Sequence, residues 1–138
     1  MKKISIITVC YNSEKTIRHT IESVLSQGYP DIEYIVIDGL SSDNTMNIVN
    51  EYIEKITKIV TEPDQGIYDA MNKGVKHSTG EIVGILNSDD FFENPFVISD
   101  VMDHFKSNPS SSLVIGDVVY VEPTNLVNIT RFYSAIKF

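Results

Sequence analysis

The chain has little cysteine and few basic residues, and each shortage narrows the range of possible functions. Cys10 is the only cysteine among 138 residues, so no internal disulfide can form and a reducing, cytoplasmic compartment is expected. The 11 lysines and arginines stand against 19 aspartates and glutamates, which gives a net charge of -8. A nucleic-acid-binding domain carries a basic patch. We therefore expect no nucleic-acid partner, and an anionic ligand would need a metal ion or backbone donors to offset the acidic field.

Long apolar segments are also missing. No stretch approaches the roughly 20 apolar residues of a membrane-spanning helix. The first apolar run, residues 4–10, contains Ser5 and Thr8 and is too short for the core of a signal peptide. We expect a soluble domain in the cytoplasm, and we leave open a peripheral attachment at the inner membrane in the full-length protein.

Glycine is absent from the turn that follows this first apolar run. The turn has the sequence Cys10-Tyr11-Asn12-Ser13-Glu14. A dinucleotide-binding fold needs glycines here so that the backbone can approach a pyrophosphate, so NAD binding is not expected. The chain also has no Walker-type loop and none of the Gly- and Lys/Arg-rich sequence with which a nucleotidyltransferase would hold a triphosphate.

Short segments rich in β-branched residues alternate with segments of helical periodicity. We predict strands near 4–9, 32–38, 58–61 and 82–87, and helices near 14–27, 43–54 and 67–77. This alternation predicts an α/β fold with a mostly parallel sheet covered by helices on both faces. Beyond it we expect a helix near Pro95 and two further strands at 113–121 and 126–133, all within one domain spanning 1–138.

The fourth predicted strand ends in acidic residues. Segment 81–90 has the sequence EIVGILNSDD. Because the carboxyl ends of parallel strands face the crevice in which α/β sheets bind ligands, Asp89 and Asp90 are candidate ligands of a divalent cation that holds phosphate oxygens. The alternative is that one of them only caps the turn into Phe91 and Phe92.

Four segments, in their order and spacing, resemble the large family 2 of inverting glycosyltransferases. They are residues 8–12 (TVCYN), 37–45 (IDGLSSDNT), 63–81 (beginning PDQGIYDAMNKG and ending STGE) and 87–90 (NSDD). The resemblance covers roughly residues 3–125. It implies the GT-A, or nucleotide-diphospho-sugar transferase, fold, with a Rossmann-like, mostly parallel sheet flanked by helices.

The resemblance implies a nucleotide pocket at the carboxyl edge of the sheet. The implied nucleotide-binding residues are Thr8, Tyr11, Asn12, Asp38, Lys73 and Ser88. Tyr11 offers an aromatic face, and Asp38 can accept hydrogen bonds from base or ribose donors. The alternatives are a rim aromatic for Tyr11, a turn-forming role for Asp38 and an ion pair with Asp69 for Lys73. Asp43 is expected to cap the following helix.

The resemblance also implies a metal, Mg²⁺ or Mn²⁺, held by Asp89 with Asp90 beside it. The family motif is Asp-x-Asp, and this chain has Asn87 in place of the first Asp. An amide carbonyl can still orient on a ribose hydroxyl or a metal-bound water, so we expect a weakened site and not a lost one. Gly39 stands where many relatives carry a second Asp, which leaves the base specificity less defined.

The implied reaction moves a sugar from a nucleoside diphosphate sugar, expected to be a UDP-sugar, to the hydroxyl of a glycan or glycolipid acceptor with inversion. In the family the general base lies far downstream of the metal motif. We therefore expect it beyond Phe138, and we expect this chain to be the donor-binding part of a longer enzyme. Asp117 is the one remaining acid in a suggestive place, with a structural role as the alternative.

By analogy with relatives we expect a role in bacterial surface polysaccharide synthesis. The alternative function is a non-catalytic module that binds nucleotide sugars. Nothing in the residues indicates an oligomeric state.

Overall fold

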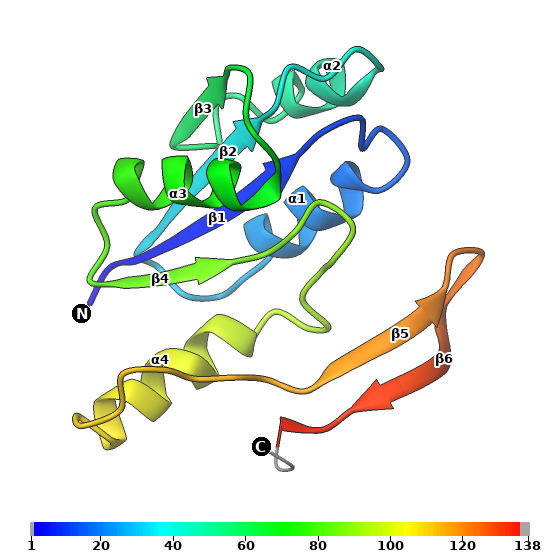
Figure 1. The fold of residues 1–138 in the computed structure, drawn as a ribbon. Helices are drawn as coiled ribbons and strands as arrows, with labels where there is room; N and C mark the ends of the chain where they lie inside the picture. Colours follow the sequence, from blue (N-terminus) through cyan, green and yellow to red (C-terminus); the bar gives the residue numbers. More distant parts are fainter. Residues whose placement is uncertain (1, 136–138) are drawn as a thin grey trace. The chain divides into compact units, whose positions relative to one another are not determined.

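The computed structural model describes residues 2–135, which divide into two compact units at the boundary between Asp103 and His104. A parallel four-stranded sheet forms the first unit (Figure 1). Its strands are β1 (Ile4–Cys10), β2 (Ile32–Asp38), β3 (Lys58–Thr61) and β4 (Ile82–Ile85), in the order β3-β2-β1-β4. All of β1 and nearly all of β2 are buried, which is why both are continuous apolar runs. The predicted parallel sheet with the first strand inside it is confirmed.

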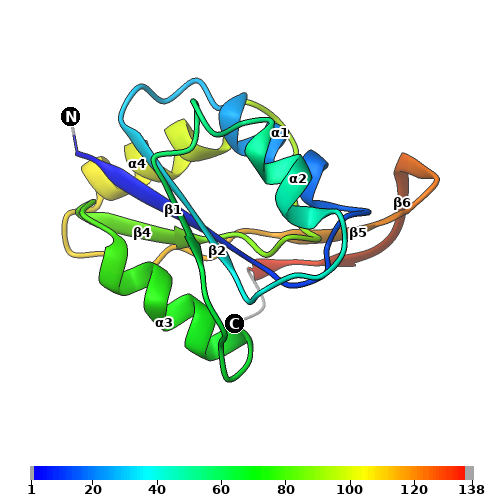
Figure 2. The same ribbon diagram turned by 90° about the horizontal axis from the view of Figure 1, so that it is seen from above.

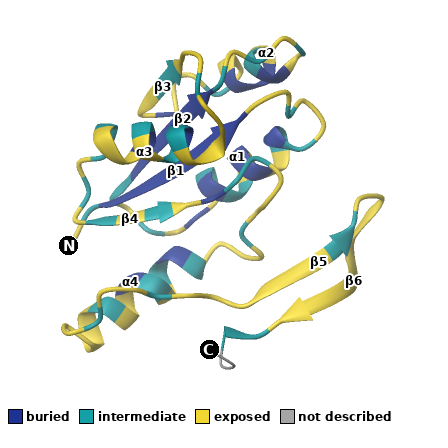
Figure 3. Ribbon diagram, in the orientation of Figure 1, coloured by how far each residue is buried: buried dark blue, intermediate teal, exposed yellow. Residues whose placement is uncertain are grey.

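Helices cover both faces of this sheet (Figures 1 and 2). On one face α1 (Ile17–Leu25) and α2 (Thr45–Asn50) pack over the apolar side chains that β1 and β2 direct to that side. The first turns of α4 (Val97–Ser107) join the same core through Ile98 and Met102. On the other face α3 (Ile67–His77) packs Ala70 against Ile7 and Ile35. Figure 3 shows the buried core of β1 and β2 between these layers.

Three elements are shorter than their predictions. Residues 14–16 form a turn in which the N–H groups of Thr16 and Ile17 both donate to the Ser13 carbonyl, so α1 begins at Ile17. The second helix ends at Asn50, and residues 51–55 continue as turns. The fourth strand ends at Ile85, although the Leu86 N–H still donates to the Ile7 carbonyl at 2.9 Å. Polar residues at these ends make local hydrogen bonds that compete with regular structure.

A buried carboxylate ties the amino end of the sheet together. Glu33 on β2 is 6% exposed and accepts hydrogen bonds from the Ser5 hydroxyl at 2.5 Å and from the backbone and hydroxyl of Thr79 at 2.7 Å each. The Lys3 ammonium lies 3.0 Å from the same carboxylate. Burial opposes ionisation, but these hydrogen bonds outweigh it and lower the pKa of Glu33 to about 2. The loop between α3 and β4 is thereby fixed to β1 and β2.

The second unit contains an antiparallel hairpin of β5 (Val118–Glu122) and β6 (Asn125–Tyr133). The strand predicted at 113–121 begins only at Val118. Both strands are largely exposed, because a two-stranded hairpin has no second layer of its own (Figure 3). The Asp117 carboxylate accepts the Ala135 N–H at 2.7 Å and so joins the two ends of the hairpin, which favours its structural interpretation. Within residues 2–135 no helix is long and apolar enough to cross a membrane.

Candidate functional site

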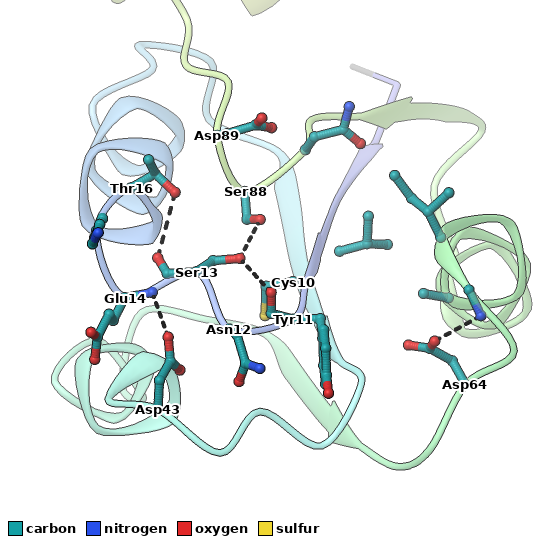
Figure 4. Close-up of a pocket in the computed structure, with 16 residues that line it drawn as sticks. Cys10, Tyr11, Asn12, Ser13, Glu14, Thr16, Asp43, Asp64, Ser88 and Asp89 are labelled. Atoms are coloured by element: carbon teal, nitrogen blue, oxygen red, sulfur yellow. Dashed lines mark hydrogen bonds between the residues drawn. The ribbon is translucent and has the colours of Figure 1, made fainter. Parts of the chain in front are cut away.

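An open cavity of about 710 Å³ lies at the carboxyl edge of the sheet (Figure 4). Parallel strands bring their carboxyl ends to the same edge, so segments far apart in sequence meet there. The lining comes from four segments. They are residues 9–16 at the end of β1 and after it, Asp43 after β2, the residues Asp64, Gly66, Ile67 and Ala70 from the loop after β3 and the start of α3, and Asn87–Asp89 after β4. Of the predicted site residues, Tyr11, Asn12, Ser88 and Asp89 line the cavity, whereas Thr8, Asp38, Lys73 and Asp90 do not.

Asn12 locks the loop after β1 to the loop after β2. Its N–H donates to the Ser41 hydroxyl at 2.9 Å, and its side-chain carbonyl accepts the Ser42 N–H at 2.8 Å. The residue has a φ of 49°, in the left-handed region that asparagine tolerates better than most residues. These contacts use the Asn12 side-chain carbonyl inside the protein, and a role of Asn12 in nucleotide binding stays a prediction.

Asp43 and Glu14 add a second pair of contacts between the same loops. The Asp43 carboxylate accepts the N–H groups of Glu14 at 3.1 Å and of Thr45 at 2.9 Å, while the Glu14 carboxylate accepts the Asn44 N–H at 2.9 Å. Desolvation opposes the ionised form of Asp43, and the hydrogen bonds from Thr45 and Glu14 outweigh it and lower its pKa. Asn44 holds the N-cap position of α2, but it is the Asp43 carboxylate that binds the first helical N–H.

Asp38 lies at the predicted edge but beneath the cavity floor. Its side chain is fully buried and accepts hydrogen bonds from the backbone and hydroxyl of Ser41, and the Cys10 thiol lies 3.8 Å away. Burial, and then the charge and hydrogen bonding of Asp38, raise the pKa of the Cys10 thiol. Cys10 is therefore a core residue, as expected, and not a nucleophile.

Thr8 and Lys73 are also engaged within the protein. The buried Thr8 hydroxyl accepts the Tyr34 hydroxyl at 3.1 Å. The Lys73 ammonium donates to the Pro63 carbonyl at 2.6 Å and lies 3.3 Å from Glu62 and 3.1 Å from Asp69. The expected ion pair with Asp69 is present, and Lys73 binds the loop ahead of its own helix. A nucleotide-binding role for either residue stays a prediction.

The segment after β4 presents Asp89 to the cavity. The Asp90 N–H donates to the Asn87 carbonyl at 3.0 Å, and this turn leaves Asp89 exposed at its tip (Figure 4). The Thr20 hydroxyl of α1 anchors the turn through the carbonyls of Ser88 at 3.0 Å and Asp90 at 2.7 Å. Burial, and then the charge of Asp89, raise the pKa of Asp90.

The residues of this turn fit a divalent cation that is shared with a ligand. The side-chain carbonyl of Asn87 is buried and has no hydrogen-bond partner among residues 2–135, so one side-chain oxygen of the turn that carries Asp89 is not used within the described part of the protein. No group of three or more His, Cys, Asp or Glu side chains that could hold a metal occurs in the part of the chain that the structure describes. Mg²⁺ commonly takes one or two carboxylates and completes its shell with water and phosphate oxygens, which matches this small donor set.

The structure adds cavity residues that sequence patterns did not single out, above all Asp64. Its sequence signals are its place in the loop that follows the third predicted strand, since loops at the carboxyl ends of strands line this edge, and its position inside the family-like segment 63–81. One carboxylate oxygen accepts the Gly66 N–H at 2.9 Å. With Glu14, Asp43 and Asp89, it makes the lining of the cavity strongly acidic, with Lys15 as the one basic side chain among the residues that line it.

Comparison with known proteins agrees with this architecture. Residues 5–136 match the family described as glycosyl transferase family 2. An uncharacterised glycosyltransferase of Mycobacterium tuberculosis is 36% identical over 101 residues, which cover 72% of this chain and 38% of that protein. The poly-β-1,6-N-acetyl-D-glucosamine synthase of Staphylococcus epidermidis is 35% identical over 118 residues, which cover 83% of this chain and 28% of the synthase. The chain therefore spans well under half the length of these relatives.

Solved structures show the same fold. The S. aureus protein TarS (residues 1–349) in complex with UDP-GlcNAc superimposes with a TM-score of 0.72 at 25% identity, over 83% of this chain and 37% of TarS. A mannosyltransferase from Pyrobaculum calidifontis has the same TM-score, 0.72, at 22% identity, over 91% of this chain and 37% of that one, a likeness of fold alone. Because the family match runs through nearly the whole chain and the sheet has the topology of these structures, we conclude that the chain belongs to glycosyl transferase family 2 and has the GT-A fold.

Proposed function

We propose that this chain is the donor-binding part of an inverting glycosyltransferase that takes a UDP-sugar and a divalent cation. Together with family membership, the observation that carries the proposal is the turn after β4, which presents exposed Asp89 to the cavity and contains the unpartnered side-chain carbonyl of Asn87 two residues before it. A purely structural turn would satisfy that buried carbonyl within the protein. An oxygen pair at a strand end is instead suited to a cation that bridges to a diphosphate.

The charge of the cavity supports the same conclusion. Four carboxylates and one lysine line it, so an anionic diphosphate would be repelled in the absence of a counter-ion. When bound, Mg²⁺ or Mn²⁺ would offset the negative charge that develops on the leaving diphosphate. Asp89 would hold the cation directly, and Asn87 and Asp90 would orient it from either side of the turn.

The remaining predicted residues fall into two groups. Tyr11 is 63% exposed at the cavity and would stack on the nucleotide base. Ser88, whose hydroxyl lies 2.8 Å from that of Ser13, would lie near the diphosphate beside Asp89. Thr8, Asn12, Asp38 and Lys73 would act by shaping the loops around the nucleotide, because their polar groups already bind the protein. The general base would come from residues after Phe138.

The relatives suggest the donor and the pathway. The TarS complex contains UDP-GlcNAc, and the S. epidermidis relative is a polysaccharide synthase, so we propose a UDP-sugar donor, a glycan acceptor and a role in polysaccharide synthesis.

Calorimetric titration of UDP-GlcNAc into the chain, with and without Mn²⁺, tests the proposal. Affinity should be Mn²⁺-dependent, and Asp89→Ala should reduce the Mn²⁺-dependent affinity about tenfold or more because it removes the carboxylate that touches the cation. Exposed Glu54→Ala, which removes the same charge away from the cavity, should leave the affinity unchanged. Equal affinities for all proteins, with the metal present or absent, would show that the acidic turn is structural.

Sugar transfer by the full-length protein distinguishes an enzyme from a binding module. Release of UDP from UDP-GlcNAc in the presence of an acceptor glycan supports the transferase. Tight, Mn²⁺-dependent binding without turnover by the full-length protein would support the alternative, a non-catalytic nucleotide-sugar-binding module.

A further inference from the structure

We propose that Asp64 selects the base of the nucleotide, by accepting a hydrogen bond from a ring N–H of uracil or guanine. This inference rests on the proposed function and assigns a specificity residue within the same cavity. It differs from the expectation drawn from the sequence, in which Asp38 reads the base.

The Asp64 carboxylate has one oxygen committed to the protein and one directed at the cavity. Its Oδ1 accepts the Gly66 N–H at 2.9 Å. Its Oδ2 comes against Gly39, so closely that a Cβ atom on Gly39 would overlap it. The same Cβ would lie 3.5 Å from Cδ2 of Tyr11. The carboxylate and the exposed aromatic ring, which come from the loops after β3 and β1, therefore both lie beside Gly39. Figure 4 labels these two side chains at the cavity.

Side chains of α3 hold the loop that carries Asp64 in position. The Asp69 carboxylate accepts the Gln65 N–H at 3.0 Å, and the Lys73 ammonium donates to the Pro63 carbonyl at 2.6 Å. The Lys73 side chain is only 17% exposed and pairs with Asp69, so this clamp is partly shielded from solvent. Asp64 is therefore presented to the cavity before any ligand arrives, which lowers the ordering cost of binding.

The other candidates for base recognition are already occupied. Asp38 is fully buried and binds Ser41, and the side-chain carbonyl of Asn12 binds Ser42. Asp89 lies at the end of a different strand, where the proposed cation and diphosphate would sit. Asp64 keeps one oxygen, Oδ2, that no described hydrogen bond uses, and the contacts around Gly39 place that oxygen near Tyr11.

The chemistry of a carboxylate beside an aromatic face defines the ligand. A base stacked on Tyr11 would present its edge to Asp64, and an ionised carboxylate can only accept hydrogen bonds. Uracil offers its N3–H and guanine its N1–H at that edge. Cytosine and adenine present an unprotonated ring nitrogen there, whose lone pair would face the carboxylate and leave both acceptors unpaired.

Calorimetry with UDP, GDP, CDP, ADP and inorganic diphosphate, all with Mn²⁺, tests this. The wild-type chain should bind UDP or GDP about tenfold or more tightly than CDP and ADP, and the tighter of UDP and GDP identifies the base. In Asp64→Asn the side-chain amide can donate to N3 of cytosine, so the preference for UDP over CDP should fall to about twofold. Inorganic diphosphate should bind both proteins equally.

Two further variants separate base selection from charge and from folding. Gly39→Ala adds a methyl group where Asp64 Oδ2 lies, so it should reduce the base preference although every carboxylate is retained. Because Gly39 does not adopt a positive φ, its backbone tolerates alanine. Exposed Glu54→Gln removes one charge elsewhere and should preserve the preference. Circular dichroism verifies folding, and if Asp64→Asn is unfolded, Gly39→Ala decides the question.

The outcomes are distinct. The assignment of Asp64 is overturned, while the donor site stands, if the wild-type chain binds all four nucleotides equally. It is also overturned if the wild-type chain discriminates among them and Asp64→Asn and Gly39→Ala both keep the full preference. If neither the nucleotides nor diphosphate bind, the proposed function fails, and the assignment of Asp64 fails with it.

Discussion

The buried carboxylate of Glu33 should make the free energy of unfolding of this chain depend on pH, and the substitution Glu33→Gln should remove that dependence. Four hydrogen bonds from Ser5, Thr79 and Lys3 hold Glu33 ionised, and they lower its pKa from an ordinary 4.5 to about 2 against the opposing effect of burial. At 1.36 kcal/mol per pH unit, this difference corresponds to about 3 kcal/mol of the free energy of unfolding. For a domain whose total is about 5–15 kcal/mol, the loss would be conspicuous.

The sign follows from the direction of the shift. A carboxyl whose pKa is lower in the folded chain contributes its full stabilisation above the unfolded pKa of 4.5, and the contribution disappears as the pH falls toward 2. A glutamine side chain carries no charge and presents an NH₂ group to the surrounding donors, so Glu33→Gln should lose about 3 kcal/mol at pH 7. At pH 3 the wild-type chain should have lost part of the same contribution, and the two proteins should differ less.

Urea unfolding monitored by circular dichroism at pH 7, 5, 4 and 3 would measure this difference. Exposed Glu54→Gln serves as the matched control and should differ from the wild-type chain by less than about 0.5 kcal/mol at each pH. A difference between Glu33→Gln and the wild-type chain that is equally large at pH 7 and pH 3 would refute the electrostatic origin. A difference below about 0.5 kcal/mol at pH 7 would refute the whole account of this network.

Two further predictions concern the proposed metal-binding turn after β4 and a strained residue in the loop after β2. Asp90→Asn should weaken Mn²⁺-dependent binding of UDP-GlcNAc less than Asp89→Ala does, and Asn87→Asp should strengthen this binding or leave it unchanged, because a carboxylate replaces the unpartnered carbonyl. Calorimetry of the three variants measures these effects. If Asp90→Asn had the largest effect, the metal ligand would have been assigned one residue too early. Leu40, at the Gly39 turn, has a φ of 63°, a conformation that costs a branched side chain about 1 kcal/mol. Leu40→Gly should therefore raise the free energy of unfolding, by up to about 1 kcal/mol in urea titrations, whereas a decrease would mean that the leucine side chain contributes packing that outweighs the strain.

Much of the fold was predictable because it depends on local pattern. The β-branched runs at residues 4–9 and 32–38 are apolar throughout, which only strands covered on both faces tolerate, and they form the two buried central strands. The third strand and third helix begin and end where the pattern changes, at Lys58–Thr61 and Ile67–His77. The starts of α1 and β5 were placed wrongly, because Ser13 and residues 113–117 can satisfy the backbone in more than one way.

The candidate site, like the fold, was predictable from the sequence only in part. That the acids after β4 would stand at the carboxyl edge follows from the sequence, because a parallel sheet sends every strand end to one side. Which oxygens remain available at that edge is decided by tertiary contacts between loops. Asp38 ends β2 and Asp64 follows β3, and the two look alike in the sequence. Ser41 nevertheless binds the Asp38 carboxylate, whereas Lys73 holds the loop that presents Asp64 to the cavity. The contact of Ser41 with Asp38 is local and spans three residues. The place of Asp64 beside Gly39 and Tyr11 comes instead from the packing of loops that follow three different strands, and no pattern within a single segment encodes it.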